Sequence, residues 1–134
     1  MLAFDKLKPH SGQVKKNMKY SISLDIGATK ILGGVVVGKK VLHKIKRPTQ
    51  SKKSNQKIIN NIIDVIQELK VEQSGSLSKI VIGFAGQVDY HQGIVLSTGN
   101  FSPRFKNIKL ADKLKNKFKV PVSIDNDVKR FTLG

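Results

Sequence analysis

The chain has 134 residues, enough for one domain with a hydrophobic core but too few for two full lobes. It carries 25 Lys and Arg against 9 Asp and Glu, a formal net charge of +16. The lack of Cys excludes disulfides and thiolate catalysis, and three scattered His leave no zinc site by spacing.

The positive charge is spread along the whole chain. The few aromatic residues do not alternate with the lysines, as they do in sites for single-stranded nucleic acid. We therefore expect a solvated, lysine-rich surface and no specific nucleic-acid partner, with a polyanion partner as the alternative. No apolar run approaches the roughly 20 residues of a membrane span, and the N-terminus has no secretory signal, so we expect a cytoplasmic protein with no membrane partner.

The first part of the chain predicts a leader, three strands and a helix. Residues 1–17 are polar and lysine-rich, which predicts a disordered leader before a lobe at 18–134. Apolar patterns then predict an antiparallel meander of three strands, joined by short turns, at residues 19–26, 31–37 and 41–46. An isoleucine-rich stripe, Ile58 to Leu69, predicts a helix with Ser54 as its N-cap.

The second part predicts strands that alternate with helices. The elements are strand, short strand, helix, strand and the start of a helix, at residues 79–86, 94–96, 110–118, 120–124 and 128–134. A strand, a helix and a strand in sequence predict a right-handed crossover onto the sheet. The order βββαβαβα therefore predicts an α/β fold, with a mixed sheet and helices packed on it.

Residues 25–30, Asp-Ile-Gly-Ala-Thr-Lys, join the first two predicted strands. The backbone N–H groups of a tight hairpin can converge on an anion, and Thr29 and Lys30 add a hydroxyl donor and a cation. Asp25, on the polar face of the strand, could hold a magnesium ion through water. A plain hairpin with a solvated Asp25 is the alternative from these residues alone.

Three later stretches have glycine or polar residues where strands end. In residues 83–89, the glycines beside Phe84-Ala85 either let a ligand approach the backbone or form an ordinary strand exit. Residues 96–100, Leu-Ser-Thr-Gly-Asn, suit a polyhydroxylated ligand but are also common in turns. In residues 124–128, Asp127 is either a helix N-cap or a general base that accepts a hydroxyl proton.

The order of these four stretches resembles the N-terminal half of the ROK family, which includes glucokinases, other hexose and N-acetylhexosamine kinases, and sugar-responsive repressors. The resemblance runs from about Met18 to Gly134. It implies a ribonuclease-H-like lobe of the actin and hexokinase superfamily, and the predicted order of elements agrees with that fold. It also implies a sugar and ATP with Mg as ligands, while the Cys/His zinc site of the family has no counterpart in this chain.

The resemblance implies roles for individual residues. The residues that would bind the ATP phosphates are Asp25, Gly27, Ala28, Thr29 and Lys30. The residues that would contact sugar hydroxyls are Gly86, Gln87, Thr98, Asn100 and Asn126. Asp127 would match the catalytic base, which takes the proton from the attacking sugar hydroxyl.

The sequence departs from the family pattern in three places. Ala85 stands where a proline is usual, Val128 and long side chains follow Asp127, and the chain ends where the family continues into a second lobe. We therefore expect a truncated or fragmentary ATP-dependent sugar kinase that has little or no activity as an isolated lobe. The alternative is a non-catalytic sugar-binding or regulatory module; residues 1–17 hold no helix-turn-helix for a DNA-binding version.

Overall fold

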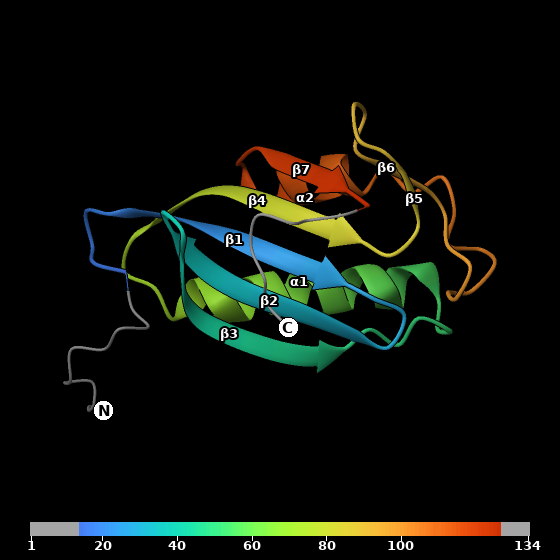
Figure 1. Ribbon diagram of the computed structural model, residues 1–134, viewed down its shortest axis with the longest axis horizontal. Coiled ribbons are helices and arrows are strands. Elements are labelled where there is room, and N and C mark those ends of the chain that lie inside the picture. Colours follow the sequence, from blue (N-terminus) through green and yellow to red (C-terminus); the bar gives the residue numbers. More distant parts are fainter. Residues whose placement is uncertain (1–13, 127–134) are drawn as a thin grey trace.

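A five-stranded sheet forms the centre of the structure, a computed structural model that describes residues 14–126 (Figure 1). Its strands are β1 (Lys19–Ile26), β2 (Lys30–Val37), β3 (Lys40–Pro48), β4 (Ser76–Phe84) and β7 (Val122–Asp125). They lie in the order β3-β2-β1-β4-β7. The predicted antiparallel meander is confirmed, and β4 and β7 extend it in parallel from β1. β3 also runs parallel to β1, because both pair antiparallel with β2, so four C-terminal strand ends meet at one edge.

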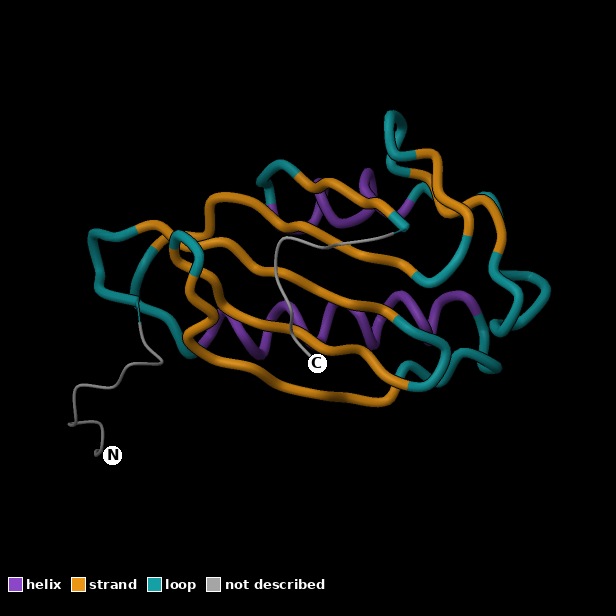
Figure 2. Tube along the Cα trace, viewed as in Figure 1, coloured by secondary structure: helices purple, strands orange, loops and turns teal. Residues whose placement is uncertain are grey.

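Two helices cover one face of this sheet. They are α1 (Asn55–Val71) and α2 (Leu110–Phe118), and Figure 2 shows both on the same side. Ser54 caps α1 as predicted, since its hydroxyl accepts a hydrogen bond from the Lys57 N–H at 3.1 Å. The predicted third helix at residues 128–134 lies outside the described residues. Neither helix of residues 14–126 is both long and apolar enough to cross a membrane.

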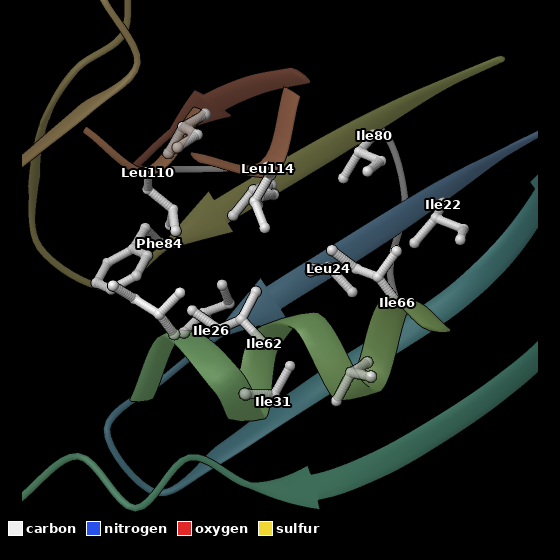
Figure 3. Packing of buried hydrophobic residues seen from close by; sticks show 14 of the residues in the cluster. Ile22, Leu24, Ile26, Ile31, Ile62, Ile66, Ile80, Phe84, Leu110 and Leu114 are labelled. Atoms are coloured by element: carbon white, nitrogen blue, oxygen red, sulfur yellow. The ribbon is translucent and has the colours of Figure 1, made fainter. Parts of the chain in front are cut away.

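The hydrophobic core lies between the sheet and these helices (Figure 3). Alternate residues of β1 and one apolar stripe of α1 are fully buried there, among them Ile22, Leu24, Ile62 and Ile66. Each such side chain stabilises the fold by about 1.5–3 kcal/mol relative to exposure. Gly33 of β2 lies directly under α1, and a Cβ there would come within 2.8 Å of Val65 Cγ1. The close approach of helix and sheet therefore requires glycine at this position.

A second, two-stranded sheet follows β4. It consists of β5 (Gln87–Asp89) and β6 (Ile94–Ser97), paired antiparallel. The short strand at 94–96 was predicted and is confirmed. Its partner β5 was not, because three residues, two of them polar, are too few to show an alternating pattern.

The N-terminal segment contributes to the core from Val14 onward. Val14 is 2% exposed, and its N–H donates to Gln73 Oε1 at 2.7 Å. A Cβ on Gly75 would lie 2.5 Å from the carbonyl oxygen of Met18, so this segment packs tightly on the loop that joins α1 to β4. The last residues of the predicted leader thus contact the lobe, while residues 1–13 lie outside the described residues. The division at Met18 stays a prediction.

Candidate functional site

The predicted site residues at strand ends gather at one edge of the sheet. Asp25 of β1 pairs in register with Gly83 of β4, which in turn pairs with Asp125 of β7. Residues paired across neighbouring strands point to the same face, so both carboxylates lie on the face opposite α1, about 10 Å apart by two strand spacings. Gly83 between them has no side chain. Both carboxylates are exposed whereas Gly83 is buried, so the row presents two separated carboxylates at this edge of the sheet.

The turn between β1 and β2 presents hydrogen-bond donors. Two of its carbonyl groups have partners: Thr49 Oγ1 donates to Gly27 O at 2.7 Å, and the Thr49 N–H donates to Thr29 O at 3.1 Å. The hydrogen bonds described for residues 14–126 include none from the N–H groups of Ala28 or Thr29. The side chains of Thr29 and Lys30 are exposed beside them. The turn therefore offers two N–H donors, a hydroxyl and a cation, the groups that bind an anion.

The glycine in this turn is not required by the fold. Gly27 does not have a positive φ, and an added Cβ would meet only the Lys30 carbonyl oxygen, at an ordinary 3.5 Å. A plain hairpin would therefore tolerate a side chain at this position. The position of this Cβ adjoins the N–H groups of Ala28 and Thr29, and the choice between an anion-binding turn and a plain hairpin stays a prediction.

The end of β4 approaches the loop after β6. Gly86 donates its N–H to Phe84 O at 3.0 Å, and a Cβ on Gly86 would lie 2.6 Å from Ser97 O and 2.9 Å from Thr98 Cγ2. Gln87 Oε1 accepts a hydrogen bond from Ser97 Oγ at 3.2 Å. The structure thus brings Gly86, Gln87 and Thr98 together, as the sugar-contact prediction requires.

The loop after β6 carries two more predicted residues. Thr98 Oγ1 is buried and has no hydrogen-bond partner among the described residues, an arrangement that costs free energy. Asn100 is exposed, and Phe101 beside it packs against Phe84 with ring centroids 5.2 Å apart. This ring contact holds the loop over the end of β4.

The end of β7 carries the last predicted residues. Asn126 is exposed, and its N–H donates to Asp125 Oδ1 at 2.7 Å. Asp127, the predicted catalytic base, lies outside the described residues. Within residues 14–126, no three His, Cys, Asp or Glu side chains gather in a group that could hold a metal.

Sequence reasoning missed Thr49, Ser51 and Asn61. Thr49 and Ser51 are 0% and 6% exposed although they lie in a polar loop after β3. Asn61 of α1 donates to Thr49 O and to Gln50 Oε1, both at 2.9 Å. The only signal was a pair of hydroxyl residues after a strand, and such residues are common in ordinary loops.

Comparison with known families shows to which family the chain belongs. Residues 21–134 match the model of the ROK family. The chain belongs to the ROK family. The predicted resemblance is thereby confirmed, and so is the α/β lobe with a mixed sheet, since solved ROK structures share it. The roles of the individual site residues stay predictions.

Relatives of known sequence and structure support this assignment. A glucokinase of Thermotoga maritima is 32% identical over 114 residues, or 84% of this chain and 35% of that protein. An uncharacterised protein of Clostridium perfringens is 30% identical over 112 residues, or 83% of this chain and 37% of that protein. A ROK family glucokinase from Streptomyces griseus, solved in complex with glucose and AMPPNP, superimposes with a TM-score of 0.70 at 28% identity, over 80% of this chain and 33% of that chain. The chain thus spans about a third of the length of these relatives.

Proposed function

We propose that this chain forms the N-terminal lobe of an ATP-dependent sugar kinase, which transfers the γ-phosphoryl group of ATP to a hydroxyl of a hexose or N-acetylhexosamine. The observation that carries the proposal is the β1–β2 turn, where the free N–H groups of Ala28 and Thr29 and the exposed side chains of Thr29 and Lys30 follow Gly27 directly. The ROK relatives support a sugar and ATP as the ligands, since they include glucokinases and one was solved with glucose and the ATP analogue AMPPNP.

The phosphate side of the reaction is assigned to the turn. The N–H groups of Ala28 and Thr29 would bind phosphate oxygens, and the Lys30 ammonium would offset their charge. Asp25 is an exposed carboxylate at the start of the turn, and carboxylate oxygens suit Mg²⁺, so Asp25 would hold the ion through water. When bound, Mg²⁺ neutralises charge that develops on the transferred group.

The sugar side is assigned to the loops at the ends of β4, β6 and β7. Gln87, Thr98, Asn100 and Asn126 carry the hydroxyl and amide groups that exchange hydrogen bonds with a sugar. The packing of Gly86 on Thr98 and the hydrogen bond from Ser97 to Gln87 support this assignment, because they bring the loops together. Asp127 would take the proton from the attacking hydroxyl oxygen, while the turn positions the phosphate for in-line attack.

The Gly27→Ala variant tests the turn. We expect ATP affinity to fall about tenfold or more, because the methyl group fills the space beside the donors, whereas the free energy of unfolding should change by less than about 1 kcal/mol. ATP titration followed by amide chemical shifts measures the first quantity, and urea unfolding measures the second. Gly99→Ala is the matched control, since a Cβ there meets nothing within 4 Å and lies outside the turn. Unchanged ATP affinity in Gly27→Ala would contradict the assignment.

The 134-residue chain by itself should have little or no kinase activity. Asp25, Thr29, Lys30 and Asn100 are all exposed, so nothing in residues 14–126 excludes water from them, and water exclusion supports efficient phosphoryl transfer. A coupled assay with glucose and ATP checks this expectation. Turnover in the ordinary kinase range, about 1–100 s⁻¹, would refute it. Glucose binding without ATP binding would instead favour a non-catalytic sugar-binding module.

A further inference from the structure

We infer that Thr49 is a positioning residue for the phosphate-binding turn, fixed in place by Asn61 of α1. This inference rests on the proposed function, because it assigns to Thr49 the orientation of the donors that bind ATP. Thr49 follows β3 directly and is 0% exposed. It therefore contacts the turn from the protein interior and is not expected to touch the ligand.

Two hydrogen bonds fix the direction of the turn's peptide groups. Thr49 Oγ1 donates to Gly27 O, and the Thr49 N–H donates to Thr29 O, at 2.7 and 3.1 Å. In a trans peptide the C=O of one residue and the N–H of the next point in opposite directions. Because the Gly27 carbonyl is held toward Thr49, the Ala28 N–H is held away from it. The Gly27 and Thr29 carbonyl groups therefore point away from the anion, and the Ala28 N–H points toward it.

Asn61 connects Thr49 to helix α1, and the hydrogen bonds of Thr49 to the turn and to Asn61 are called the clamp below. Its side-chain amide donates to Thr49 O and to Gln50 Oε1, both at 2.9 Å, which uses both of its N–H groups. Gln50 has a φ of 58°, a value that residues other than glycine seldom adopt, so this loop conformation needs support. Asn61 stands beside Ile62, which is fully buried in the core. The turn is therefore positioned by α1 across the intervening loop.

The Thr49→Val variant removes the hydroxyl and keeps the shape of the side chain and its backbone N–H. We expect ATP affinity to fall about tenfold, and the Ala28 amide resonance to shift and broaden even without ATP. Thr49→Ser should restore both, because it returns the donor. Ser78→Ala is the matched control: Ser78 Oγ also donates to a carbonyl of β1, Tyr20 O at 2.9 Å, but at the opposite end of the strand. That variant should bind ATP as the unaltered chain does.

The outcomes separate this inference from the proposed function. If the unaltered chain binds ATP and Thr49→Val binds it equally well, the positioning role is wrong while the proposed function stands. If the unaltered chain does not bind ATP, both are wrong. Should Thr49→Val fail to fold, Asn61→Ala replaces it; a loss of several-fold in ATP affinity, with a moved Ala28 resonance, supports the clamp, and an unchanged affinity overturns it.

Discussion

Exchanging Asp127 for Asn, in a protein that joins this lobe to the second lobe of the ROK family, is expected to lower kcat by about 10²–10⁴-fold. Asparagine keeps the size of the side chain and its hydrogen bonding, but it cannot accept the proton of the attacking sugar hydroxyl. The affinities for glucose and ATP should therefore stay within about threefold, because the lost interaction belongs to the transition state. Steady-state kinetics with glucose, together with equilibrium glucose binding, measures both quantities.

Asp112→Asn provides the control for this experiment. Asp112 is an exposed carboxylate in the first turn of α2, away from the strand ends that carry the site. Its exchange removes the same charge but should leave kcat unchanged. An Asp127→Asn enzyme that keeps most of its kcat would exclude the role of general base. A large loss of glucose affinity with kcat retained would make Asp127 a sugar ligand instead.

The patterns that predicted the fold correctly are local in sequence. Alternation in residues 19–26 predicted β1, and the Ser54 cap and isoleucine stripe predicted α1, because each depends on a backbone period or on a bond across a few residues. The strand and helix sequence predicted a crossover onto a mixed sheet, and the structure places β1, β4 and β7 in parallel and in this order. It is this order that brings Asp25, Gly83 and Asp125 into one row.

The contacts that the sequence could not predict join residues far apart in the chain. The hydroxyl of Thr49 reaches Gly27 across 22 positions, and Val14 reaches Gln73 across 59. No sequence periodicity or local motif indicates either contact, because each forms only when the folded sheet brings distant strands and loops together. The surroundings of Gly27 were likewise hidden in the sequence. Its context allowed a plain hairpin or an anion-binding turn, and it could not show that an added Cβ would meet only the Lys30 carbonyl oxygen.

Replacing Phe84 with Ala is expected to reduce the free energy of unfolding by about 3–5 kcal/mol. Phe84 is 1% exposed at the end of β4, and its ring lies 5.2 Å from Phe101 and 5.9 Å from Phe105, measured between centroids. The truncation would leave a cavity among these rings that the surrounding sheet cannot close. Since whole domains are stable by only about 5–15 kcal/mol, urea unfolding should show a midpoint far below that of the unaltered chain.

The Phe84→Ala exchange should also weaken the binding of glucose by the loops near the end of β4. Phe101 directly follows Asn100, and its contact with Phe84 holds the loop beside Gly86, so glucose binding should weaken in whatever fraction of Phe84→Ala remains folded. Phe118→Ala is the control, because Phe118 is only partly buried at the far end of α2 and should cost less stability and no glucose affinity. Equal losses of stability in the two variants would contradict the central place of Phe84. A folded Phe84→Ala with full glucose affinity would show that the loop is positioned by other contacts, such as the hydrogen bonds of Ser51 with Asn100 O and with the Ser102 N–H.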